Sequence, residues 1–335
     1  MTITTPVDIK DYLDHYIVGQ EKTKKILSTA LFNHLTCMKK KLSSHENTMI
    51  VGPTGSGKSY LAKKLADFAG LPCVSIDSTA IAQRGWKGLN INEVFSFLYN
   101  LKGNSEYGVL IFDEFDKLMR PNRNNHGENI SVLTQSSLLS ILDGTPLQDK
   151  DNLFLTDRIF YIFTGAFEDI FKAPEDTSSP IGFIPSGEPS PASRRKQAED
   201  FDPNAFRRQM IDYGCLPELA GRISNIVKID TLTKDQLYSA VMSVDNSPVS
   251  YYEKLFRIWG KRLVIDPAYV KDLCARAQED ALGVRGARNM LSEELRVLFY
   301  HSFETGDDIV YLGHKRHKKA LLKPAVSLVS LEEEP

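Results

Sequence analysis

Short runs rich in apolar residues along the first part of the chain predict the strands of a buried sheet. They occupy residues 48–51, 72–77, 109–114 and 158–167, and a last run at 227–230 closes this region. Runs of Val, Ile, Leu and Phe without regular polar alternation are typical of parallel strands that are covered on both faces. The pattern therefore predicts an α/β fold with a parallel sheet.

Between these runs, apolar residues recur at helical spacing. Residues 8–15, 21–40, 60–66 and 130–142 are expected to form helices, and residues 78–88 a short helix that leads into a loop. From residue 234 the pattern is mostly helical. Two helices there are expected to start at Ser247-Pro248 and Asp266-Pro267, because a capping residue followed by proline is a helix-start signal.

These elements divide the chain into two domains and a tail. We expect a large α/β domain over residues 1–232, a small helical domain over 233–313 and a charged tail over 314–335. Residues 171–200 are rich in Pro, Ser and Gly and show no apolar periodicity. They are therefore expected to form a long mobile loop of the large domain, and such loops in compact domains are often functional.

Residues 52–59 fit the phosphate-binding P-loop pattern between a strand and a helix. Glycines let the backbone turn so that its N–H groups face a phosphate, and the helix N-terminus adds partial positive charge. Lys58 is expected to reach the β- and γ-phosphates and Ser59 a Mg²⁺ ion. The order of strand, loop and helix disfavours a merely structural turn. The predicted phosphate-binding residues are Gly52, Pro53, Thr54, Gly55, Ser56, Gly57, Lys58 and Ser59.

The strand at 109–114 ends in two acids, Asp113 and Glu114. A buried parallel strand delivers such carboxylates to its C-terminal edge. Asp113 is expected to hold Mg²⁺, directly or through water, and Glu114 to orient and polarise the attacking water, because phosphoryl transfer depends on positioning. Together with the P-loop, this pair predicts a nucleoside triphosphatase.

Composition narrows the choice of partners and compartment. The chain has 335 residues, ordinary apolar and charged fractions, a formal net charge of -2 and four widely spaced cysteines. The balanced charge does not favour nucleic acid as a partner, and the cysteine spacing favours neither a zinc site nor a disulfide framework. With no apolar run long enough to span a bilayer and no export signal, we expect a cytoplasmic protein without a membrane partner.

The order of motifs resembles the ClpX-type AAA+ unfoldases over about residues 5 to 310. Residues 16–20, Tyr-Ile-Val-Gly-Gln, are similar to the adenine-contacting segment of that family, which implies that Ile17 and Val18 flank the base. As isolated residues, these two would be read as core aliphatics. The fold implied is a P-loop AAA+ large domain with a parallel sheet, followed by a small α-helical lid domain.

Three more motif positions carry roles that the resemblance implies. Thr164 falls at the sensor-1 position, where a hydroxyl can bond the γ-phosphate or the lytic water, although a lone threonine can simply end a strand. Residues 213–223 resemble the family's Leu-x-Pro-Glu-Leu-x-Gly-Arg box, in which Arg222 would be the arginine finger, with an intrachain salt bridge as the alternative. Arg285 would be sensor 2 and would bridge lid and nucleotide.

Two loops resemble the polypeptide-handling parts of the family. Gly85-Trp86-Lys87-Gly88 is similar to the pore loop that grips substrate, with Lys87 in place of an aliphatic residue. Ile181-Gly182-Phe183 is similar to the loop that docks into the ClpP peptidase ring, with Ile184 where a glycine is usual. The basic triplet of the pore entrance is absent from residues 146–152. Without the family context, the favoured interpretation of Trp86 is an amphipathic residue in a Gly-bounded surface turn.

The resemblance implies an ATP- and Mg²⁺-dependent protein unfoldase that forms a hexameric ring and delivers substrate proteins to a ClpP-type peptidase. The ring follows from the finger, because one chain cannot close Arg222 on its own nucleotide. The family's N-terminal zinc-binding domain has no counterpart in this sequence. Two alternatives stay open: an ATP-driven remodeller of protein complexes that works without a protease, and a nucleotide-dependent switch or nucleic-acid-associated motor.

Overall fold

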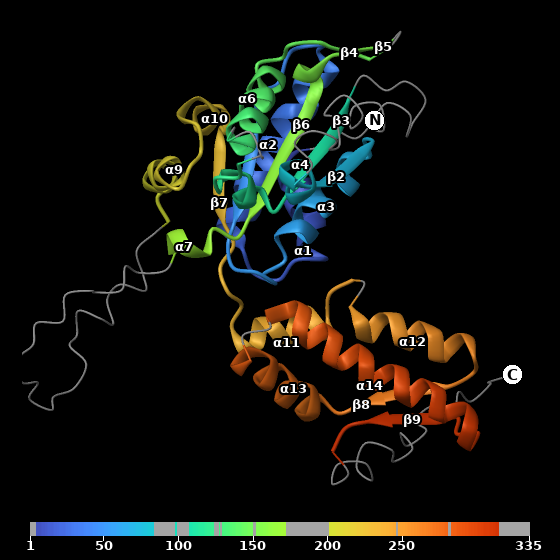
Figure 1. The fold of residues 1–335 in the computed structure, drawn as a ribbon. Helices are drawn as coiled ribbons and strands as arrows, with labels where there is room; N and C mark the ends of the chain where they lie inside the picture. The colour runs from blue at the N-terminus through green and yellow to red at the C-terminus, as the bar shows by residue number, and fades with distance from the viewer. Residues whose placement is uncertain are drawn as a thin grey trace, which may run out of the picture. The chain divides into compact units, whose positions relative to one another are not determined.

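The structure is a computed structural model of the chain (Figure 1). It divides into two compact units. The first comprises Met1–Leu13, Gln20–Pro53 and Lys58–Asp230, and the second comprises Asp14–Gly19, Thr54–Gly57 and Thr231–Pro335. The residues that the structure describes are 5–83, 98, 107–123, 127, 129–149, 152–171, 201–245, 247–280 and 283–314.

A parallel sheet of five strands forms the centre of the first unit (Figure 1). Its order is β2-β3-β6-β1-β7, so β6 separates the strand before the P-loop from the strand that ends in Asp113. All four pairings are parallel, which confirms the predicted α/β fold. The strands are β1 (Thr48–Val51), β2 (Cys73–Asp77), β3 (Gly108–Asp113), β6 (Ile159–Gly165) and β7 (Asn225–Lys228).

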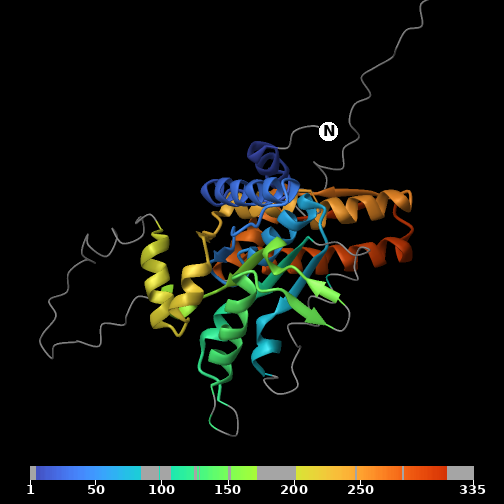
Figure 2. The ribbon, with the colours of Figure 1, turned by 90° about the horizontal axis from the view of Figure 1, so that it is seen from above.

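Helices cover both faces of this sheet, and α2 and α6 lie on opposite sides of it (Figure 2). The helix predicted over 130–142 is found with the same bounds, whereas the one predicted over 60–66 begins already at Lys58. The helices of this unit are α1 (Pro6–Asp14), α2 (Glu21–Lys39), α3 (Lys58–Ala69), α4 (Ser78–Gln83), α6 (Ile130–Leu142), α7 (Glu168–Phe171), α9 (Pro203–Asp212) and α10 (Pro217–Arg222), with the short 3₁₀ helices η1 (Phe115–Met119) and η2 (Thr156–Arg158).

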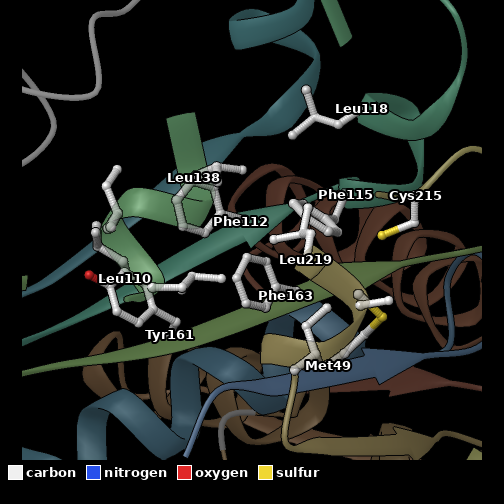
Figure 3. Packing of buried hydrophobic residues seen from close by; sticks show 14 of the residues in the cluster. Met49, Leu110, Phe112, Phe115, Leu118, Leu138, Tyr161, Phe163, Cys215 and Leu219 are labelled. Atoms are coloured by element: carbon white, nitrogen blue, oxygen red, sulfur yellow. The ribbon is translucent and has the colours of Figure 1, made fainter. Parts of the chain in front are cut away.

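An aromatic core holds the strands that carry the candidate site (Figure 3). The rings of Phe112 on β3 and Phe163 on β6 stack with their centroids 5.3 Å apart, and Phe115 of η1 lies 4.6 Å from Phe163. All three side chains are fully buried. Truncating a core phenylalanine typically costs about 3–5 kcal/mol, so this packing fixes the ends of β3 and β6 relative to each other.

A pair of short strands and helix α9 are among the elements of the first unit that were not predicted. The strands β4 (Leu147–Asp149) and β5 (Asn152–Phe154) pair in antiparallel orientation, in a segment where no strand was expected. Helix α9 follows the predicted loop, and the Asp202 side chain caps it by accepting a hydrogen bond from the Asn204 N–H at 2.8 Å. The loop itself, residues 172–200, lies outside the described part of the chain.

The second unit contains the predicted helices together with a small sheet. Ser247 and Asp266 cap two of the helices, as their Ser-Pro and Asp-Pro pairs predicted. The small sheet was not predicted: its strands β8 (Arg262–Ile265) and β9 (Ile309–Leu312) pair in parallel. The helices are α11 (Lys234–Met242), α12 (Pro248–Ile258), α13 (Pro267–Glu279) and α14 (Gly283–Thr305).

The last described residue of the chain, His314, contacts the second unit. The Nε2 atom of His314 lies 2.9 Å from the Asp272 carboxylate in the second unit. Residues 315–335 lie outside the described part, and the predicted domain boundaries at 232 and 313 remain a proposal.

Among the described residues, none of the helices has the length and apolarity needed to cross a bilayer.

His34 on α2 is a buried histidine and gives this unit a predicted dependence on pH. Its ring is 1% exposed, lies 5.2 Å from the ring of Phe160, and neither ring nitrogen has a hydrogen-bond partner among the described residues. Burial lowers the pKa of His34 from 6.5 to about 4, because the charged form cannot be solvated there.

Folding therefore favours the neutral ring, and its contribution to stability is present above pH 6.5 and is lost as the pH falls towards about 4. Between about pH 7.5 and pH 5 the free energy of unfolding should fall by about 2 kcal/mol through His34 alone. Urea unfolding of His34→Leu should lack this component, whereas the exposed control His15→Gln should retain it. Equal pH dependence of His34→Leu and the parent chain would contradict the assignment.

Candidate active site

The P-loop follows β1 and turns into α3 through glycines in backbone conformations that other residues rarely adopt. Gly52, Gly55 and Gly57 have φ values of 150°, 77° and 97°. A Cβ atom on Gly52 would lie 2.5 Å from the Ile229 carbonyl oxygen, so this position is closed to any side chain. Residues 52–59 thus form the turn that the sequence predicted, and their contacts with phosphate remain a prediction.

Lys58 begins α3 and is 9% exposed. Its Nζ donates hydrogen bonds to the carbonyl oxygens of Gly52 at 2.7 Å and Pro53 at 2.9 Å. These bonds hold the ammonium group within the loop and away from solvent. In this position it can interact with a phosphate that the backbone of the loop binds. Ser59 follows in the first turn of the helix, with its side chain half-buried.

Asp113 and Thr164 meet at the C-terminal edge of the sheet. Their strands pair with Phe112 opposite Phe163, which places the two next residues side by side. The Thr164 hydroxyl is fully buried and donates a hydrogen bond to Asp113 Oδ1. The Glu114 N–H donates to the same oxygen at 3.0 Å. The structure therefore links Thr164 to the predicted metal ligand, a connection that the sequence reasoning missed.

These residues suit the magnesium ion that the sequence predicts. Mg²⁺ prefers oxygen ligands and is commonly held by one or two carboxylates with water, and Ser59 and Asp113 offer a hydroxyl and a carboxylate. Within the described residues, Asp113 Oδ2 accepts no hydrogen bond, so one oxygen stays available while Oδ1 is fixed. No cluster of three or more His, Cys, Asp or Glu side chains occurs in that part of the chain.

Glu114 has a left-handed backbone conformation, with φ 53° and ψ 39°. A residue other than glycine rarely adopts this conformation, which costs roughly 1–2 kcal/mol and often marks a functional position. The turn is stabilised by the Lys117 N–H, which donates to the Glu114 carbonyl oxygen at 3.0 Å. It redirects the chain from β3 into η1 and leaves the Glu114 side chain exposed at the edge of the sheet.

Asp116 continues the acidic run but has a structural role. It is 3% exposed, and its Oδ1 accepts a hydrogen bond from the Ala166 N–H at 3.2 Å. This bond ties η1 to the end of β6, just beyond Thr164. The three acids at the end of β3 therefore face different environments, and Glu114 is the exposed one.

Arg222 lies at the end of α10, with its side chain 53% exposed, and its Nε donates to Asp143 Oδ1. Asp143 follows α6 in the same chain and raises the pKa of Arg222 through this hydrogen bond, which keeps the guanidinium charged. The intrachain ion pair that we considered as an alternative is therefore present. The finger role of Arg222 remains a prediction, since an exposed pair leaves the side chain accessible.

Of the remaining predicted residues, the structure describes the adenine-contacting pair and Arg285 but not the pore and docking residues. Ile17 and Val18 are half-buried in the turn before α2, and the Gln20 side chain fixes the end of that turn through hydrogen bonds of 2.8 and 3.1 Å with the Asp230 backbone. Arg285 is exposed in the first turn of α14. The pore residues Trp86 and Lys87 and the docking residues Ile181, Gly182 and Phe183 lie outside the described residues.

The fold and the site are those of a P-loop ATPase, and they are similar to the AAA class of such enzymes. Residues 48–173 match the protein family described as ATPase family associated with various cellular activities (AAA). This match covers the P-loop, the acidic edge and Thr164. The chain is therefore an ATPase, and ATP is its nucleotide.

Curated relatives extend the similarity to most of the chain. The ATP-dependent Clp protease ATP-binding subunit ClpX of Treponema denticola is 29% identical over 98% of this chain and 84% of the relative. ClpX 2 of Wolinella succinogenes is 29% identical over 88% of this chain and 77% of the relative. For ClpX of Bacteroides fragilis the values are 27%, 85% and 74%. The resemblance to ClpX-type AAA+ proteins is therefore confirmed.

Proposed function

We propose that this chain is a cytoplasmic, ATP-dependent protein unfoldase that works as a hexameric ring and delivers polypeptides to a ClpP-type peptidase. The similarity to ClpX-named proteins over nearly the whole chain, both units included, carries the proposal. Those relatives are named as ATP-binding subunits of a protease, which supports a peptidase partner here. The balanced net charge supports polypeptide over nucleic acid as the substrate.

ATP hydrolysis would be divided among residues of two subunits. Lys58 and the P-loop backbone would bind the phosphates, while Asp113, fixed by Thr164, and Ser59 would hold Mg²⁺. The ion, when bound, neutralises charge on the β- and γ-phosphates. Glu114 orients the attacking water from the exposed edge of the sheet, and Arg222 of a neighbouring subunit stabilises the charge that develops on the transferred phosphoryl group.

Further residues of the site would contact the adenine and connect the nucleotide to the lid. Ile17 and Val18 offer apolar surface to the base from a turn that Gln20 fixes, and Arg285 bridges lid and nucleotide. Trp86 would grip the substrate polypeptide in the pore and transmit the force of each cycle. Lys87 stands where the family's pore loop has an aliphatic residue, so the family's substrate preference is not carried over to this chain.

Delivery to a peptidase would depend on the loop between α7 and α9. Ile181 and Phe183 flank Gly182 in a stretch rich in Pro and Ser, and burying two such side chains is worth roughly 1.5 to 3 kcal/mol each. One loop therefore makes a weak contact. Six loops of a ring that faces a peptidase ring bind far more strongly, because each engagement raises the effective concentration for the next.

Deleting residues 181–183 tests this proposal. We expect ATP-dependent degradation of a folded reporter by a ClpP-type peptidase to fall at least about tenfold, while ATP hydrolysis and unfolding of the reporter persist, because only the multivalent contact is lost. A deletion of equal length elsewhere in the loop, over residues 188–190, is the control. Degradation at the parent rate would reject docking through these residues and favour a remodeller that works without a protease.

A further inference from the structure

The end of α10 is fixed from outside the helix. The Arg222 carbonyl oxygen accepts a hydrogen bond from Asn47 Nδ2 at 2.9 Å. Arg207 of α9 donates through Nε to the Ala220 carbonyl oxygen at 3.1 Å and through Nη2 to that of Ile223 at 2.8 Å. The last carbonyl groups of a helix have no partner within it, so these two side chains supply the missing bonds. The backbone of Arg222 is thereby held in place.

The start of α10 is fixed by Gln135, a fully buried residue of α6. Its Oε1 accepts a hydrogen bond from the Leu216 N–H at 2.8 Å. Its Nε2 donates to the carbonyl oxygens of Gly214 at 3.1 Å and Leu118 at 3.2 Å. Leu118 belongs to η1, the helix that directly follows Glu114. One amide group therefore connects α6, the entry to α10 and the segment behind the predicted catalytic carboxylate.

The carboxylate of Asp143 provides the second attachment of α10 to α6. Asp143 directly follows α6 as its capping residue. Its N–H donates to the Leu139 carbonyl oxygen at 2.9 Å, and Gly144 then turns the chain with φ 82°. From Gln135 to Asp143 the helix advances about 12 Å, and from Leu216 to Arg222 the chain advances about 9 Å. The two helices are thus joined near the start of α10 through its backbone and at its end through the Arg222 side chain.

Only one edge of the Arg222 guanidinium is used in this arrangement. Nε donates to Asp143, whereas Nη1 and Nη2 form no hydrogen bond among the described residues, and the side chain is 53% exposed. A planar guanidinium that is held at Nε keeps its two terminal nitrogens free as a fork, which suits bidentate binding of phosphate oxygens. The contact with Asp143 therefore leaves the phosphate-binding edge open.

We propose that Asp143 is a positioning residue, which holds Arg222 by its Nε so that the free fork of the guanidinium is presented to the nucleotide of a neighbouring subunit. This inference rests on the finger role of Arg222 proposed above. Pre-orienting a long side chain lowers the entropic cost of reaching the transition state, so the effect appears in kcat and not in ATP binding. Because both partners are exposed, the pair contributes little to stability.

Steady-state ATP hydrolysis by Asp143→Ala and Asp143→Asn rings tests the proposal. We expect Asp143→Ala to lower kcat about tenfold with KM changed less than about twofold, and Asp143→Asn to retain more activity, because its amide oxygen can still accept from Nε. Asp212→Ala, which removes an exposed carboxylate at the end of α9, is the matched control and should keep the parent kcat. An unchanged or raised kcat in Asp143→Ala overturns the proposal.

A double-mutant cycle separates this inference from the proposed function. In an Arg222→Ala background, Asp143→Ala should cause no further loss of kcat, since the residue acts only through the arginine. An independent, multiplicative loss would show that Asp143 acts elsewhere and would overturn the positioning role. If Arg222→Ala lowers kcat but Asp143→Ala does not, the positioning role alone is wrong. If Arg222→Ala leaves kcat unchanged, the finger role fails and the positioning role fails with it.

Discussion

Replacing Glu114 by Gln is expected to slow ATP hydrolysis at least about 10²-fold while ATP binding persists. The amide keeps the size of the side chain but cannot polarise the attacking water as a carboxylate does. The surroundings of this side chain explain why the substitution should slow the hydrolysis step and not weaken ATP binding. Within the described residues, Glu114 is bonded only through its backbone, to Asp113 Oδ1 and Lys117 N, and both bonds survive the substitution.

Single-turnover hydrolysis and binding of a fluorescent ATP analogue together measure the two effects. Glu253→Gln, an exposed glutamate of α12, is the matched control and should behave as the parent chain. Lys58→Ala should differ from both by losing nucleotide binding, since its ammonium group is held inside the P-loop by Gly52 and Pro53. Hydrolysis by Glu114→Gln at the parent rate would show that the catalytic carboxylate is another residue.

Arg222→Ala should reduce kcat about 10³-fold with little change in nucleotide affinity, because an arginine finger stabilises charge that exists only in the transition state. The backbone contacts of Asn47 and Arg207 with the end of α10 do not involve the Arg222 side chain, so the helix should remain in place. Arg208→Ala on α9 removes an exposed arginine nearby and is the control.

Mixed rings test whether Arg222 acts on a neighbouring subunit. A subunit with Arg222→Ala still has Glu114, and a subunit with Glu114→Gln still has Arg222. Where the second donates its arginine to the first, a complete site is formed and part of the turnover should return. Co-purification of two differently tagged subunits establishes that mixed rings exist. Rings that contain both subunits but stay inactive would show that Arg222 acts within its own chain.

Sequence reasoning located the sheet and most helices because their signals are local. The strands β1, β3 and β6 appear as apolar runs because nearly all of their residues are buried. Helix α6 has the predicted bounds because its apolar residues recur at helical spacing up to the turn at Gly144. Helix α9 was missed although Asp202-Pro203 is a helix-start signal of the same kind as Ser247-Pro248. That signal could have been used.

The short strands β4, β5, β8 and β9 were missed for another reason. Each has only three or four residues, and such a run is too short to show a period of two. In the second unit, β8 and β9 are separated by the length of α13 and α14, so that nothing in either segment indicates its partner. Pairing between distant segments is decided by the packing of the helices between them.

The sequence by itself determined which residues form the P-loop, which acids end β3 and which arginine closes the motif around Pro217. Each of these motifs is a run of neighbouring residues with a fixed local geometry. Only the tertiary structure decided how these residues are connected. Thr164 binds Asp113 because β6 lies beside β3, and Asp143 binds Arg222 because α10 packs along α6. Such bonds depend on strand order and helix packing, which bring together residues that are far apart along the chain.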